Sequence, residues 1–96
     1  MVKSLMFAEK YCLIAFKSTH HALAAEKALE SGLIEQVVIP TPKQISASCG
    51  LALKIYINDY PQAVYLLLER GLVDVEAYEV NSEDQPSYKR LNFSPI

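Results

Sequence analysis

Residues 50–57 carry the sequence feature that most restricts the fold, an alternation of apolar and polar side chains. Leucine or isoleucine occupies every second position, and Lys54 and Tyr56 lie between them. This period of two is typical of a β-strand in a sheet that is covered on one face only. Residues 73–78 alternate in the same way. The sequence therefore predicts a sheet with one buried face and one face open to solvent.

The remaining elements follow from their end signals and their apolar spacing. The uncharged run at 11–16 is typical of a buried strand, and the β-branched run at 35–40 closes with a proline, which cannot donate to a strand ladder. Apolar residues recur at helical spacing between Ser18, a good N-cap, and Gly32, a typical C-terminal stop. They recur again at this spacing after Pro61. The predicted order is a strand at 11–16, a helix at 19–31, strands at 35–40 and 50–57, a helix at 61–70 and a strand at 73–78.

This order of elements is the β-α-β-β-α-β pattern of ferredoxin-like folds. In this α+β fold two helices pack on one face of a four-stranded antiparallel sheet. A chain of 96 residues is long enough for one such core. We expect a single domain over residues 1–80, with its regular part starting near residue 9. The polar, proline-containing residues 81–96 are expected to form a C-terminal tail.

Composition and charge exclude several classes of partner. A net charge of -2 provides no positive surface for a phosphate backbone, so we do not expect nucleic acid binding. Residues 1–7 are too short for a signal-peptide core or a membrane span, which predicts a cytoplasmic protein without a membrane partner. Two cysteines in a chain with no export signal, Cys12 and Cys49, are expected to be reduced.

The predicted topology brings Cys49 to a candidate site. The end of the first strand, the start of the first helix and the start of the third strand meet at one sheet edge, which places residues 16–21 near Cys49 and Gly50. A thiolate beside a helix N-terminus is stabilised by free N–H groups and by the helix dipole. Gly50 leaves room for a partner to approach the backbone. The residues expected to support the thiolate are Lys17, Ser18, Thr19, His20, His21 and Lys43.

Each of these candidates also has a purely structural interpretation. Cys49 can be a small buried residue at a strand start, and His20 and His21 can belong to a solvated first turn, where neighbours face different ways. Cys12 lies within an apolar strand, and we expect it to be an inert core thiol. Cys49 and two histidines are too few ligands, without a recognised spacing, for a metal site. We therefore expect neither a metal nor a cofactor.

The residue pattern also resembles a known family. Three segments, Phe16-Lys17-Ser18-Thr19-His20-His21-Ala22-Leu23, Pro40-Thr41-Pro42-Lys43-Gln44-Ile45-Ser46 and Ser48-Cys49-Gly50-Leu51-Ala52-Leu53, are similar to the selenium/sulfur carrier protein-like family. The resemblance covers residues 9–80. It implies a carrier, rather than a stand-alone enzyme, that holds sulfur or selenium on Cys49 as a persulfide or selenosulfide. Such a carrier needs a donor, for example a cysteine desulfurase, and an acceptor protein.

Two other functions remain open. An interaction or regulatory module, or a homodimer, could use the open sheet face, which is expected to carry Ala52, Lys54, Tyr56, Glu76 and Tyr78. A redox-sensing thiol protein would instead form a disulfide between Cys12 and Cys49. That pairing is disfavoured because Cys12 is expected some four residues below the sheet edge, beyond the reach of a disulfide.

Overall fold

The computed structural model describes residues 5–45 and 50–93. Its elements are η1 (Leu5–Phe7), β1 (Lys10–Phe16), α1 (Thr19–Ser31), β2 (Gln36–Pro40), β3 (Leu51–Ile55), η2 (Ile57–Asp59), α2 (Tyr60–Glu69), β4 (Val75–Asn81) and β5 (Ser87–Leu91). The succession β1-α1-β2-β3-α2-β4 is the one predicted from the sequence. The predicted strand at 50–57 ends earlier, because residues 57–59 form the short 3-10 helix η2, and the strand predicted at 73–78 begins and ends later. No helix within the described ranges is long and apolar enough to cross a bilayer.

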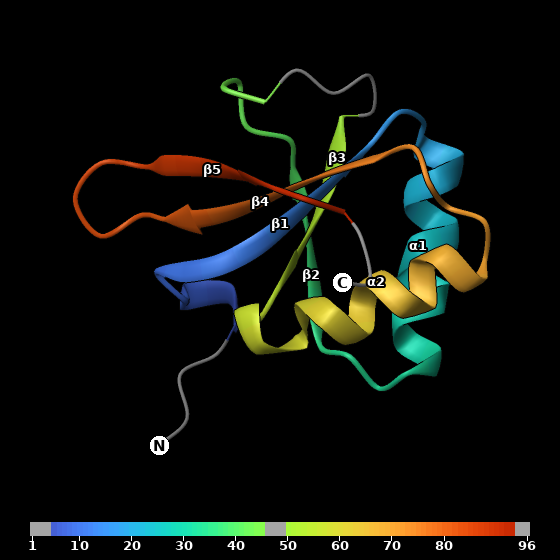
Figure 1. The fold of residues 1–96 in the computed structure, drawn as a ribbon. Coiled ribbons are helices and arrows are strands. Elements are labelled where there is room, and N and C mark those ends of the chain that lie inside the picture. Colours follow the sequence, from blue (N-terminus) through green and yellow to red (C-terminus); the bar gives the residue numbers. More distant parts are fainter. Residues whose placement is uncertain (1–4, 46–49, 94–96) are drawn as a thin grey trace.

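The strands form one antiparallel sheet in the order β2-β3-β1-β4-β5 (Figure 1). β1 is central, with β3 on one side and β4 on the other. The expected count of four strands is wrong, because residues 87–91 of the predicted tail pair with β4 as β5. β5 has an exposed or half-exposed residue at every position, so it lacks the apolar alternation that identified the other strands. The α+β class with two helices is correct for the described residues, whereas the end of the domain stays a prediction.

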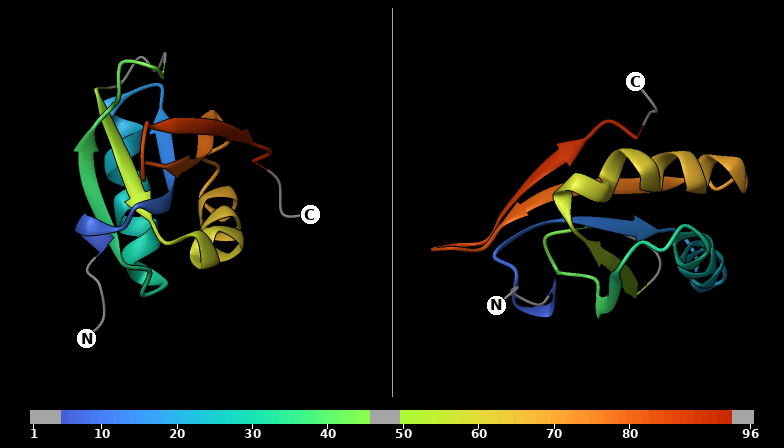
Figure 2. Two further views of the ribbon diagram at one scale, coloured as in Figure 1. Left: turned by 90° about the vertical axis from the view of Figure 1, so that its left-hand side faces the viewer. Right: turned by 90° about the horizontal axis from the view of Figure 1, so that it is seen from below.

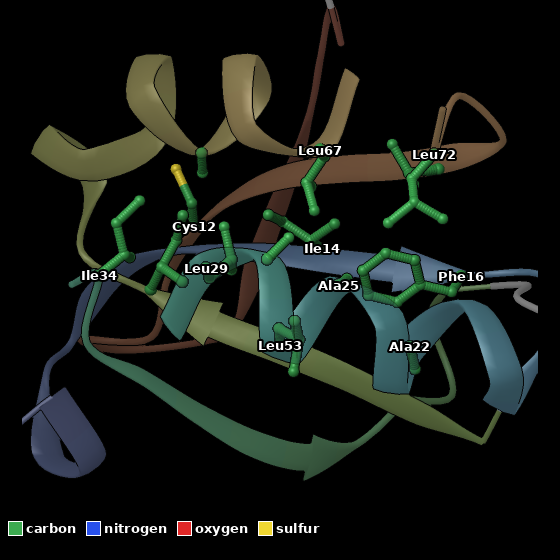
Figure 3. Close-up of a cluster of buried hydrophobic side chains, with 14 residues drawn as sticks. Cys12, Ile14, Phe16, Ala22, Ala25, Leu29, Ile34, Leu53, Leu67 and Leu72 are labelled. Carbon is green, nitrogen blue, oxygen red and sulfur yellow. The ribbon is translucent and has the colours of Figure 1, made fainter. Parts of the chain in front are cut away.

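Both helices pack against one face of the sheet, where the main core lies (Figure 3). Alternate residues of β1, namely Cys12, Ile14 and Phe16, are buried there beside Leu53 and Ile55 of β3. The helices supply a further set of buried side chains, namely Ala22, Ala25, Ala28, Leu29, Ala63 and Leu67. Three of these are alanines of α1, and their small side chains let the helix backbone approach the sheet closely.

The opposite face of the sheet is covered over part of its area, which corrects the expectation of an open face. Ala52 and Lys54 of β3 lie on this face, yet they are only 0% and 7% exposed. Ile45, from the segment after β2, packs there beside Leu13 and Ala15 of β1. A sheet face that alternates polar with apolar residues can therefore still be covered by segments outside the sheet.

The N-terminal 3-10 helix η1 supplies a second part of this cover. It lies on the side of the sheet opposite α2 (Figure 2, right) and buries Leu5 completely. The Lys54 Nζ donates to the Met6 carbonyl at 3.0 Å and lies 4.2 Å from the centre of the Tyr11 ring. Burial lowers the pKa of Lys54 from its ordinary value. Lys54 thus connects β3 to η1, and the expectation that it faces solvent is wrong. The other polar residues expected on this face, Tyr56, Glu76 and Tyr78, are half-buried.

Candidate functional site

The candidate site lies at the end of the sheet where β1 ends and β3 begins. Ala15 of β1 pairs with Ala52 of β3, so the last residue of β1, Phe16, lies beside the first residues of β3. α1 begins at Thr19, only a few residues further along the chain. The end of β1, the start of α1 and the start of β3 are therefore found at the same end of the sheet (Figure 1).

The expected carrier thiol, Cys49, lies outside the described residues, so its position and its role stay predictions. Its neighbour Gly50 is exposed, and a Cβ built on it would meet no atom within 4 Å. The Gly50 carbonyl accepts a hydrogen bond from the Thr41 N–H at 3.0 Å. A backbone hydrogen bond thus joins Thr41 to Gly50, and Gly50 itself is open to an approaching molecule.

The first turn of α1 is formed and capped as its sequence predicts. The Ser18 hydroxyl accepts a hydrogen bond from the His21 N–H at 3.1 Å, which satisfies one of the free donors at the helix start. Thr19 and His20 are exposed, and His21 is half-buried. The two imidazole rings are 6.4 Å apart and tilted by 52°. The difference in burial between the two histidines is expected, because neighbouring helical positions face different ways.

The two lysines expected near the thiolate are both exposed. Lys17 directly follows β1, and its Nζ lies 3.8 Å from the Asp74 carboxylate. This contact joins two side chains that are more than half exposed, so it adds little stability. Lys43 lies in a turn that is closed by a bond from the Ile45 N–H to the Pro42 carbonyl at 3.0 Å. Ile45 then anchors this turn on the sheet face opposite the helices.

The second thiol, Cys12, is unsuited to chemistry with a partner. It is 1% exposed and lies in the core under the helices (Figure 3). Burial, and secondarily the charge of Glu79, raises the pKa of Cys12 to about 11. It pairs with Ile55, five residues along β3 from Gly50, a separation of about 17 Å at the usual rise of a strand. Among the described residues no group of three or more His, Cys, Asp or Glu side chains could hold a metal ion.

A shallow hollow of about 260 Å³ on α1 was not expected from the sequence. It is lined by His20, Leu23, Ala24 and Lys27, and Leu23 is 51% exposed. The signal that could have identified it is the spacing of these residues, which places them on one helix face. That face begins at the same turn of α1 as the candidate site.

Comparisons with known proteins give a family for the chain. A family model described as "Putative Se/S carrier protein-like" matches residues 11–79, which is well over half of the sequence. The matched range includes both cysteines and the whole segment between β2 and β3. No curated protein and no solved structure matches the chain.

Proposed function

The chain belongs to the Se/S carrier protein-like family, and on that premise we propose that it carries sulfur or selenium on Cys49. The observation that carries the proposal is the contrast between the two cysteines within the matched range. Cys12 is buried and has a raised pKa, so it is a poor nucleophile. Cys49 is the other thiol in the sequence, and its neighbour Gly50 is exposed.

The proposed reaction is an exchange between a donor persulfide and the Cys49 thiolate. The thiolate attacks the terminal sulfur of the donor persulfide, and a new S–S bond forms as the bond to the donor cysteine breaks. The donor leaves as a thiolate. The proton stays on the transferred sulfur, which becomes the outer sulfur of the Cys49 persulfide. No external oxidant or reductant is consumed. A selenosulfide forms in the same way when the donor presents selenium.

The surroundings of Gly50 support this chemistry at three points. The N-terminus of α1 lies at the same sheet edge, and its free N–H groups and dipole favour a nearby anion. Lys17, His20, His21 and Lys43 are the candidate positive charges, and Ser18 orders the helix start by capping it. Gly50 presents no side chain that would block a partner.

The position of Cys12 relative to Gly50 also supports a carrier. A carrier must keep its bound chalcogen until the acceptor arrives, and a second nearby thiol would release it as a disulfide. Cys12 is about 17 Å along the sheet from Gly50 by strand rise, well beyond the separation that a disulfide spans. Thiol carriage further requires reducing surroundings, and we propose that the protein acts in the cytoplasm between a donor, such as a cysteine desulfurase, and an acceptor protein.

Mass spectrometry of the loaded protein tests the proposal. Reduced and desalted protein is incubated with a cysteine desulfurase and cysteine, and then with selenocysteine in a second reaction. We expect one added chalcogen on wild type, none on Cys49→Ser, and the wild-type amount on Cys12→Ala. If wild type gains no mass while an established carrier is loaded in parallel, or if the added atom maps to Cys12, the proposal is wrong.

Neither of the two other functions considered from the sequence gains support. The sheet face that an interaction module would use is covered at Ala52 and Lys54. A redox sensor would require a disulfide from Cys12, which is buried about 17 Å from Gly50 by strand rise. We also propose a ferredoxin-like arrangement for the first four strands, supported by their neighbour order β2-β3-β1-β4 and by the packing of both helices on one face.

A further inference from the structure

The two edges of the sheet differ in how they are protected. β5 forms one edge and carries Lys89 and Arg90 side by side, both exposed. Charged residues of this kind keep an edge strand from pairing with another chain. β2 forms the other edge, and its sequence Gln36–Pro40 contains no charge and three β-branched residues. Only the β5 edge therefore has the usual protection by charge.

The register of β2 shows which of its backbone groups face outward. Pro40 is opposite Leu51, and the next residue, Thr41, donates its N–H to the Gly50 carbonyl. Backbone N–H and C=O groups alternate in direction along a strand. The backbone groups of Val37 and Ile39 therefore form hydrogen bonds with β3, and those of the even-numbered residues point away from it. The N–H and C=O of Gln36 and Val38 thus point to the free edge. Pro40 also faces this edge, so its missing N–H costs the sheet no bond.

Exposed apolar side chains lie near this edge on both faces of the sheet, because Val38 is opposite Leu53 of the helix-side core and η1 packs on the other face. Val38 is 42% exposed, and η1, which packs beside β2, exposes Met6 and Phe7 by 60% and 70%. β2 lies at the rim of the sheet with η1 near its start (Figure 2, left). Among residues 5–45 and 50–93, no other chain segment pairs with the outer edge of β2. Exposed apolar side chains around an unpaired edge are typical of a surface that binds another strand.

We propose that the β2 edge pairs with the β2 edge of a second copy, antiparallel and symmetric about Val38. In this register the Val38 N–H and C=O bond those of the partner's Val38. The Gln36 N–H of each copy donates to the Pro40 carbonyl of the other. Pro40 has no N–H and donates nothing to the partner's Gln36 carbonyl, so the pairing rests on the Val38–Val38 bonds and on the bonds from the Gln36 N–H groups. The two sheets become one continuous sheet.

The side chains that meet across the symmetry axis argue for a second copy over a different strand. Val38 meets the partner's Val38 on one face, and Val37 meets the partner's Ile39 on the other. Cross-strand pairs of β-branched residues are stabilising, and like charges would be destabilising. No charged residue of β2 takes part, because the strand has none. Val37, Val38 and Ile39 thus meet compatible side chains from the same strand of a second copy, as a two-fold interface requires.

This dimer would affect the candidate site without depending on its chemistry. Thr41, which bonds Gly50, directly follows the paired strand. Continuing the register by one residue places the partner's Glu35 opposite Thr41, at the start of the segment that contains Cys49. The pairing does not require Cys49 to carry a chalcogen, so the two proposals can fail separately.

Backbone and side-chain variants of Val38 test the pairing. Val38→Pro removes the outward N–H and no hydrogen bond of the protomer, and Val38→Lys places two ammonium groups opposite each other. Val73→Lys is the matched control, because Val73 is exposed and lies outside β2. The mass of each variant is measured by light scattering over a range of concentrations, with thermal unfolding to check the fold. Amide hydrogen exchange is measured on wild type at the highest and lowest concentrations.

We expect wild type and Val73→Lys to dimerise, and both Val38 variants to dissociate about tenfold or more readily. The Val38 and Gln36 amides should exchange slowly in the dimer and quickly in the monomer, although neither bonds another strand within one protomer. A wild-type protein that stays monomeric at all concentrations would overturn the proposal. So would a dimer that persists unchanged in folded Val38→Pro, or in which the Val38 amide is unprotected.

Discussion

Thiol labelling of the native protein should show a single fast cysteine. With an alkylating reagent in excess at pH 8, Cys12 should resist modification because both its ionisation and its exposure are unfavourable. The reacting species is the thiolate, and burial raises the pKa of Cys12 to about 11. We therefore expect the labelled position in the native protein to be Cys49.

The size of the effect follows from the pKa. A thiol with a pKa of about 11 is ionised in about one molecule in a thousand at pH 8, against about one in ten for a pKa of 9.0. Ionisation alone thus slows Cys12 about a hundredfold. Because its side chain is only 1% exposed, the reagent must also wait for the core to open locally. The total slowing should exceed the ionisation factor.

The assay is a time course of labelling followed by peptide mapping, in native buffer and in denaturant. In denaturant both cysteines should react at comparable rates. In native buffer Cys49→Ser should remain almost unlabelled, and Cys12→Ala should be labelled as fast as wild type. Rapid native labelling of Cys12 would refute the assignment of this residue to the core and, with it, the argument that singles out Cys49.

Three further predictions concern stability. Because the folded state raises the Cys12 pKa from 9.0 to about 11, it favours the protonated thiol; this stability is present below pH 9 and is lost as the pH rises through 11. Between pH 9 and 11 the free energy of unfolding, measured in urea, should accordingly fall by about 2–3 kcal/mol more for wild type than for Cys12→Ala. Ser18→Ala removes the cap of α1 and should cost about 1 kcal/mol, whereas Ser87→Ala on exposed β5 should change the unfolding midpoint little. Ala25→Leu overpacks the contact between α1 and the sheet and should cost about 1–3 kcal/mol; an unchanged midpoint would mean that this contact is loose.

The order of the first six major elements could be predicted because each of them carries a local signal in its sequence. β1 is apolar throughout its centre, β3 alternates, and the alanines of α1 recur at helical spacing. β5 could not be predicted in this way. Residues 87–91 form an edge strand with mostly exposed side chains, so their local pattern is that of a polar tail, and only pairing with β4 makes them a strand.

The cover of the second sheet face was beyond prediction for a different reason. Alternation along β3 tells which side chains share a face, but it does not tell what packs on that face. Lys54 was expected in solvent because it alternates with apolar residues along the strand and so falls on the face predicted to be open. It is buried because Leu5 and Ile45 cover that side of the sheet, and the Met6 carbonyl and the Tyr11 ring receive its ammonium group. These contacts join segments far apart in the chain.

The two cysteines show how far the sequence reaches toward the site. Cys12 shares its strand parity with Ile14 and Phe16, so its place in the core follows from the pattern of β1 alone, and the structure agrees. For Cys49 the sequence supplies only the positions that flank it. The structure adds that Gly50 is open, that it is bonded to Thr41, and that it borders the edge where α1 starts. Under the proposed function, a second thiol that is buried at the centre of the sheet, away from Gly50, would not release a chalcogen carried on Cys49. That separation depends on the β1–β3 register, so a change that shifts this register should impair retention of the chalcogen even when both cysteines are intact.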